Sequence, residues 1–206
     1  MKKIDLRNWY RKEHFEFFSL FEEPLYGLTV KVDCTQAYKQ AKTRHLSFYL
    51  YYLHALLSSI NEIEALKVRI IDGDPYLFDR IDVSATVDRP NGTFGYSYIT
   101  YDADLERFSH LAKEEIKKVR ESSSLFPDKS SEGVIHFSAL PWLDFTSLSH
   151  ARKFGSSDSI PKISVGKLTE TGNKKTIPFS VHVHHALVDG IHLGQLVDLF
   201  QEKLDV

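Results

Sequence analysis

The sequence is poor in sulfur and shows no excess of one charge. Its 206 residues include one cysteine, Cys34, which excludes an internal disulfide and the four-thiolate zinc frameworks. Without a partner thiol, Cys34 is expected to act as a small buried hydrophobic residue. The 26 Lys and Arg residues nearly balance the 28 Asp and Glu residues, giving a formal net charge of −2. Nucleic-acid-binding domains normally carry a clear basic excess, so we expect no nucleic-acid partner.

Long apolar runs are also missing. The longest, Leu46 to Ile60, contains His54, Ser58 and Ser59 and is shorter than the roughly 20 apolar residues of a membrane helix. The first residues, Met1 to Trp9, are charged and have no apolar segment, so we expect no signal peptide. No repeat or Pro/Gly-rich linker divides the chain, and we expect a single domain, 1–206, located in the cytoplasm without membrane contact.

Hydrophobic periodicity predicts helices alternating with strands. Helices are expected at Leu46 to Ile60, with Ser47 as its N-cap, at Asp104 to Arg120, and from the Asp189-Gly190 turn to the end of the chain. Strands are expected at Gly27 to Val32, Leu66 to Ile71, Val83 to Val87, Thr93 to Thr100, Glu132 to Leu140, Lys162 to Leu168 and Thr176 to His184. This order predicts an α/β protein, an α+β two-layer sandwich in which helices flank a mixed β-sheet.

Four histidines crowd one short segment: His182, His184, His185 and His192. A metal site is one interpretation, but no further ligand follows at a reliable spacing, so we expect no bound metal. His182 alone fits a polar strand face exposed to solvent or to a subunit interface. His185 lies where the strand meets the turn, and a histidine there can face a cleft as a general base. Asp189 would orient this loop if it were paired with a buried cation.

The whole segment, SVHVHHALVDGIHLGQLVDLFQ, contains His-His-x-x-x-Asp-Gly followed by a predicted helix. Three more segments occur in the same order as in one known family: NWYRKEHFEFF (Asn8 to Phe18), SLFPD (Ser124 to Asp128) and FSALPWLDFTS (Phe137 to Ser147). Together these motifs resemble the chloramphenicol acetyltransferase family over nearly the full chain. The resemblance implies the family's acyltransferase fold and transfer of an acetyl group from acetyl-CoA to a hydroxyl of chloramphenicol or a related small molecule.

The resemblance also implies catalytic roles for particular residues. His185 matches the general base, and Asp189 matches an aspartate held by the arginine of the opening motif, here Arg11. Ser138 matches the hydroxyl donor that stabilises the tetrahedral oxyanion. Ser164 matches a threonine that assists through water. Acetyl-CoA is then a co-substrate, and no permanently bound cofactor is expected.

Binding residues follow from the same motifs. Ser164, Trp142 and Lys167 are expected to contact acetyl-CoA, and Phe17, Phe18, Phe94, Tyr96, Phe126 and Leu148 to contact the acceptor. Four positions depart from the family pattern. Phe18 replaces a tyrosine, Tyr96 replaces a small residue, and His150 and Arg152 replace aliphatic residues. Larger or charged groups there would change the size and polarity of the acceptor pocket, so the acceptor stays open.

The resemblance further implies a homotrimer with active sites at subunit interfaces. The aromatic opening segment agrees with this, because a monomer would expose its apolar surface. Two other functions remain possible. One is the dihydrolipoyl acyltransferase core of 2-oxoacid dehydrogenase complexes, although such chains usually follow a lipoyl domain and linkers. The other is a non-catalytic binding protein, although such a protein would be expected to lack the base or the oxyanion donor.

Overall fold

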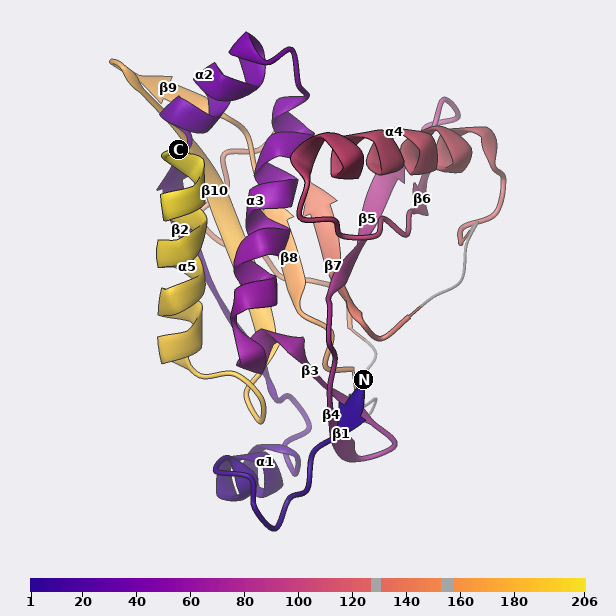
Figure 1. Ribbon diagram of the computed structural model, residues 1–206, viewed down its shortest axis with the longest axis vertical. Helices are drawn as coiled ribbons and strands as arrows, with labels where there is room; N and C mark the ends of the chain where they lie inside the picture. The colour runs from indigo at the N-terminus through magenta and orange to yellow at the C-terminus, as the bar shows by residue number, and fades with distance from the viewer. Residues whose placement is uncertain (127–130, 153–157) are drawn as a thin grey trace.

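The computed structural model describes residues 1–126, 131–152 and 158–206 and is organised around one mixed sheet (Figure 1). Its strand order is β2-β10-β8-β7-β5-β6, and β9 pairs with β10. The strands are β2 (Leu25–Asp33), β5 (Asp82–Asp88), β6 (Phe94–Tyr96), β7 (Val134–Ala139), β8 (Lys162–Val165), β9 (Thr169–Thr171) and β10 (Lys174–His184). β7 runs parallel to β5 and β8, whereas β10 runs antiparallel to β2 and β8, so the sheet is mixed as expected.

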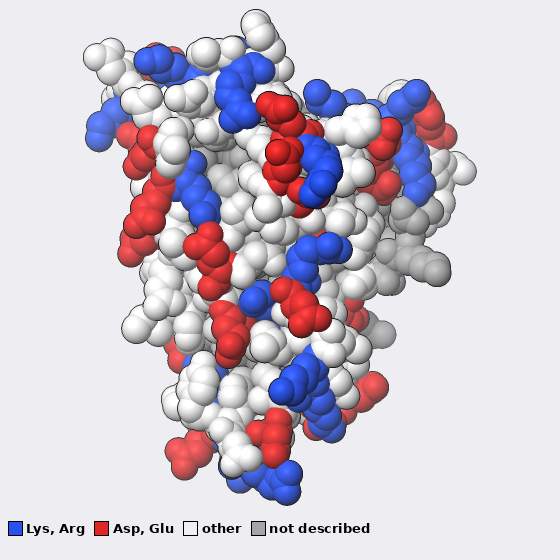
Figure 2. Space-filling view, in the orientation of Figure 1, with Lys and Arg blue, Asp and Glu red and all other residues white. Residues whose placement is uncertain are grey.

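The helices form a second layer on this sheet. They are α2 (Thr35–Thr43), α3 (Phe48–Glu62), α4 (Leu105–Glu121) and α5 (Gly190–Leu204), while α1 (Lys12–Phe18) lies near the turn between β10 and α5. Figure 1 shows α3, α4 and α5 in front of the sheet, which confirms the two-layer arrangement of helices and mixed sheet. Acidic and basic side chains are interspersed over this face (Figure 2). Within the described residues, no helix combines the length and apolar character needed to cross a membrane.

A small second sheet lies beside the main one. It has the order β1-β4-β3 and consists of β1 (Lys2–Lys3), β4 (Asp74–Leu77) and β3 (Val68–Ile71). The sequence predicted one strand from Leu66 to Ile71. In the structure its first residues belong instead to a 3-10 helix, η1 (Glu64–Lys67), and only the remainder forms β3.

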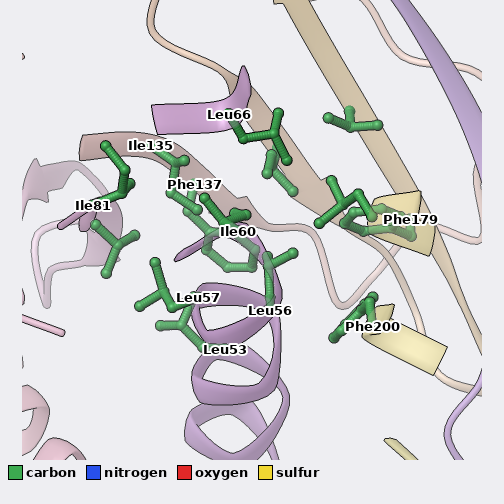
Figure 3. Close-up of a cluster of buried hydrophobic side chains, with 14 of the residues drawn as sticks. Leu53, Leu56, Leu57, Ile60, Leu66, Ile81, Ile135, Phe137, Phe179 and Phe200 are labelled. Carbon is green, nitrogen blue, oxygen red and sulfur yellow. The ribbon is translucent and has the colours of Figure 1, made fainter. Parts of the chain in front are cut away.

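The core lies between α3 and the sheet (Figure 3). Leu53, Leu56, Leu57 and Ile60 of α3 are fully buried and lie against side chains of β7 and β10 such as Phe137 and Phe179. The alternating residues of β10 that share one face of the strand, Ile177, Phe179, Val181 and Val183, are all buried. Cys34 is buried, as predicted. Truncating one of the core leucines to alanine would cost about 2–5 kcal/mol of stability.

Two local predictions need correction. The strand predicted from Thr93 to Thr100 is interrupted after β6, because the Ser97 hydroxyl accepts from the N–H of Ala85 and donates to its carbonyl. Pairing with β5 resumes only as an isolated bridge between Ile99 and Val83. Ser47 precedes α3, but its side chain makes no capping hydrogen bond. Asp104 does cap α4, since its carboxylate accepts from the N–H of Arg107 at 2.8 Å. The sequence reading also missed α1 and α2.

Candidate active site

His185 lies directly after β10, and its ring is held between two aromatic side chains. The Phe18 ring stacks on the imidazole with centroids 4.0 Å apart and planes inclined by 12°. The ring centroid of Tyr26, on β2, is 4.4 Å from that of the imidazole, with the two planes inclined by 36°. The Tyr26 hydroxyl donates to the carbonyl of Val188 at 3.3 Å. Burial raises the pKa of Tyr26 to about 12, so the phenol stays protonated. The sequence reading missed Tyr26, because only the pairing of β2 with β10 brings it to this position.

The two nitrogens of His185 lie in different surroundings. Nδ1 is buried and lies 3.5 Å from Oδ1 of Asp189. The side chain as a whole is 34% exposed, so its open edge is the one that carries Nε2. A neutral imidazole presented in this way can accept a proton from a bound hydroxyl.

Asp189 in turn is held by Arg11, as the resemblance implied. Both terminal nitrogens of Arg11 donate to the carboxylate, Nη2 to Oδ1 at 2.9 Å and Nη1 to Oδ2. Nη2 also donates to the carbonyl of His185 at 3.3 Å. The Arg11 side chain is only 4% exposed, but that of Asp189 is 31% exposed, so only the arginine is deeply buried. The guanidinium lowers the pKa of Asp189, and the pair fixes the turn that carries His185.

Ser138 lies in a different place, in a cavity of about 1180 Å³ at the carboxyl ends of the parallel strands β5 and β7. Its Oγ accepts a hydrogen bond from Oγ1 of Thr86 at 3.4 Å. Three other residues expected to bind substrates, Phe94, Tyr96 and Trp142, line the same cavity. Phe126 does not line it, but its ring stacks on Tyr96 with centroids 4.9 Å apart. The cavity therefore unites Ser138 with a largely aromatic wall.

Within one chain, Ser138 and His185 cannot meet. Ser138 is in register with Ser164, and Ser164 with Ser180, so the three serines form a row across β7, β8 and β10. His184 lies four residues beyond Ser180 on β10, which is about 13 Å along the strand. Ser180 is separated from Ser138 by two strand spacings of about 4.8 Å each. The Cα atoms of Ser138 and His184 are thus about 16 Å apart, and His185 follows at the opposite end of the sheet from the cavity.

Ser164 already has a protein partner. His150 Nε2 lies 3.0 Å from its hydroxyl, and the His150 ring contacts that of His182 edge-on with centroids 4.9 Å apart. Burial lowers the pKa of His150 to about 4, which keeps this imidazole neutral at neutral pH. His182 is half-buried, and its ring lies so close to Gly27 that a Cβ there would be 2.4 Å from it. His182 is therefore not a freely exposed residue of the sheet face. Arg152 makes an ion pair with Glu23.

The remaining predicted binding residues are dispersed. Phe17 is exposed beside Phe18, near His185 rather than near Ser138. Lys167 is exposed, and its backbone N–H donates to the carbonyl of Leu143 at 2.8 Å. Neither Lys167 nor Leu148 lines the cavity.

The clustered histidines are not arranged around a metal position. Among the residues that the structure describes, no group of three or more His, Cys, Asp or Glu side chains is placed to hold a metal ion. His192 instead takes part in the N-terminal capping of α5, because its Nδ1 accepts a hydrogen bond from the N–H of Asp189 at 2.9 Å. His184 is buried, and its Nδ1 accepts from the N–H of Ala186 at 3.2 Å.

Comparison with known proteins agrees with these motifs. The sequence matches the family model described as chloramphenicol acetyltransferase over residues 1–201. A chloramphenicol acetyltransferase of Proteus mirabilis is 29% identical over 203 residues, covering 98% of this chain and 94% of the relative. A solved structure named chloramphenicol acetyltransferase has a TM-score of 0.91 at 31% identity, covering 98% of this chain and 99% of that chain.

A more distant structure shares the fold alone. The truncated catalytic core of the 2-oxoacid dehydrogenase multienzyme complex from Thermoplasma acidophilum has a TM-score of 0.67 at 17% identity, covering 99% of both chains. The sequence match over residues 1–201 and the agreement in structure are far stronger for the first family. The chain therefore belongs to the chloramphenicol acetyltransferase family, a family of acyltransferases.

Proposed function

We propose that this protein transfers the acetyl group of acetyl-CoA to a hydroxyl of a small molecule, with His185 as general base and Ser138 as oxyanion donor. The observation that carries the proposal is the placement of His185. Its ring is fixed by Phe18 and Tyr26, its Nδ1 is buried, and its other edge is open. A base held in one orientation loses little freedom when the substrate binds, which favours proton transfer.

The reaction proceeds without a covalent enzyme intermediate. Nε2 of His185 takes the proton of the acceptor hydroxyl while that oxygen attacks the thioester carbonyl. The Ser138 hydroxyl donates a hydrogen bond to the resulting oxyanion; removal of such a donor in other enzymes costs about 2.7–4 kcal/mol. As the tetrahedral intermediate collapses, the C–S bond breaks and the imidazolium returns its proton to the thiolate of CoA. Acetyl-CoA is consumed as a co-substrate.

The proposed chemistry requires two copies of the chain. Both His185 and Ser138 must come within about 3 Å of the reacting group, yet they lie at opposite ends of the sheet. A site formed by His185 of one copy and Ser138 of another removes the conflict, and a closed ring of three copies repeats it at each interface. We therefore infer a homo-oligomer, and we propose three copies because the family resemblance implies a homotrimer. A monomeric mass in sedimentation at micromolar protein concentration would contradict this.

Chloramphenicol, which names the relatives, is the first acceptor to test. Phe94 and Tyr96 give the cavity at Ser138 an aromatic wall that suits a flat ring. The larger side chain of Tyr96 narrows this cavity, while His150 and Arg152 lie outside it. The size of the acceptor is then limited by Tyr96, and an acceptor smaller than chloramphenicol is the expected alternative.

The test is release of free CoA thiol from acetyl-CoA in the presence of chloramphenicol, smaller alcohols or dihydrolipoamide. Acetyl transfer to a hydroxyl acceptor, lost in His185→Ala, supports the proposal. Transfer to dihydrolipoamide alone would assign the chain to the 2-oxoacid dehydrogenase type of reaction. Binding of acceptors without any thiol release would identify a non-catalytic binding protein.

A mixing experiment tests the shared site. Ser138→Ala and His185→Ala proteins are each expected to be nearly inactive. Co-expression of the two forms mixed trimers, in which about one site in three pairs an intact serine with an intact histidine. Recovery of activity well above the sum of the two variants is expected. No recovery despite formation of mixed trimers would show that both residues act within one chain.

A further inference from the structure

Helix α4 forms one wall of the cavity that contains Ser138. Its acidic Glu121 lines the cavity, and it also contributes Lys113, Ile116, Lys117 and Arg120. These positions follow the spacing i, i+3, i+4 and i+7, so they share one face of the helix. Three of these four positions are basic, and at 1.5 Å per residue their charges extend over about 10 Å of this wall.

The basic charge of this wall is only partly compensated. The cavity is lined by four basic residues and by two acidic residues, Asp88 and Glu121. Arg120 donates to Asp88 at 2.7 Å, and Lys117 is 4.0 Å from Glu121. Among the residues that the structure describes, the Lys113 ammonium has no hydrogen bond or ion pair. An exposed lysine is usually solvated and has no binding role. Here, however, Lys113 faces the same cavity as the proposed oxyanion donor.

We propose that Lys113 and Lys117 bind the phosphates of acetyl-CoA. This rests on the proposed function, which places the uncharged thioester end of the molecule at Ser138. The other end of acetyl-CoA carries a diphosphate and a 3′-phosphate. Within the described lining, α4 carries three of the four basic residues, so the anionic end lies along it. Lysine binds phosphate as a flexible point charge and tolerates several phosphate positions.

The proposal predicts a defect that depends on the donor. Lys113→Glu places a negative charge on the phosphate path and is expected to raise KM for acetyl-CoA by at least about fivefold with little change in kcat. The effect should weaken as ionic strength rises. With S-acetylpantetheine, which carries the same thioester but no phosphate, parent and variant should have equal kcat/KM. The double variant Lys113→Glu/Lys117→Glu should show a larger defect with acetyl-CoA alone.

Lys39→Glu is the matched control, since Lys39 is an exposed lysine of α2 outside the cavity and the substitution changes the net charge equally. It should leave both donors unaffected. An equal loss with both donors in Lys113→Glu, or no loss with either, would overturn the proposal.

Calorimetric binding of CoA and of pantetheine gives a second, activity-independent measurement on the same proteins. If CoA binds and its affinity falls only in the Lys113 and Lys117 variants, the phosphate site stands even where no acetyl transfer is found. If the parent transfers acetyl groups but CoA binds the double variant as tightly as the parent, the proposed function stands and the phosphate site is wrong.

Discussion

The ring of Phe18 lies nearly parallel to the imidazole of His185, with centroids 4.0 Å apart. Phe18 belongs to α1, near the start of the chain, and His185 follows β10, near its end. Tyr26 closes the other side of the imidazole. Two aromatic side chains from the N-terminal part of the chain thus restrict how the imidazole of His185, near the C-terminal end, can rotate. Its Nδ1 stays buried, and the opposite edge of the ring stays open.

Removal of this stacking partner should weaken catalysis more than folding. In Phe18→Ala the imidazole is free to turn, and a misplacement of about 1 Å at a catalytic group can cost on the order of 100-fold in rate. We expect at least a tenfold lower kcat with a melting temperature close to that of the parent. Phe18→Tyr keeps an aromatic ring at this position and should retain most of the activity. Equal kcat in Phe18→Ala and the parent would show that Tyr26 alone positions the ring.

The two adjacent histidines should respond differently to substitution. His185→Gln is expected to lose about 10²- to 10⁴-fold in kcat, the usual effect of removing a general base, while CoA binding is unchanged. His184→Gln should lose stability rather than the base, because His184 is buried and its Nδ1 accepts from the N–H of Ala186. Steady-state kinetics and thermal melts of both proteins check this. If His184→Gln abolished turnover and His185→Gln kept it, the mechanism would have to be rebuilt around His184.

The Arg11–Asp189 pair should make its full contribution to the free energy of unfolding at neutral pH. Asp189→Asn or Arg11→Ala leaves one charge without its partner, which costs about 3–5 kcal/mol for a fully buried pair; we expect about 3 because Asp189 is partly exposed. Urea unfolding measures this cost. Arg11 lowers the pKa of Asp189, so this stabilisation is present above the unfolded pKa of about 3.9 and is lost as pH falls through the lower folded pKa. An unchanged unfolding midpoint in both variants would exclude a stabilising role.

Buried histidines should make the fold sensitive to mild acid. Burial lowers the pKa of His136, His150 and His184 to about 4, whereas a histidine in an unfolded chain titrates near 6.5. Between these values the unfolded state binds more protons, so the free energy of unfolding rises with pH from about 4 to 6.5. The melting temperature should therefore fall as pH is lowered from 7 to 5. His136→Gln should flatten this profile, and His14→Gln, at an exposed position, should leave it unchanged.

The sequence alone determined the local chemistry of this protein. The segment around His185, Asp189 and Gly190 predicted a strand, a turn and a helix, and the structure has β10 and α5 there. The motif resemblance also paired Arg11 with Asp189 across nearly the whole chain, and the ion pair is present. These features depend on hydrophobic periodicity, on turn residues and on the family resemblance of short motifs, which can be recognised without knowing how distant segments pack.

Tertiary structure decided which of these residues meet. Strand direction is set by long-range pairing, and the antiparallel pairing of β10 with β8 places His185 and Ser138 at opposite ends of one sheet. Tyr26 reaches His185 only through the register of β2 against β10. His150 binds the Ser164 hydroxyl because the segment after β7 returns across the sheet. Local sequence carries no record of such pairings, because each depends on the free energy of burying side chains from distant segments together.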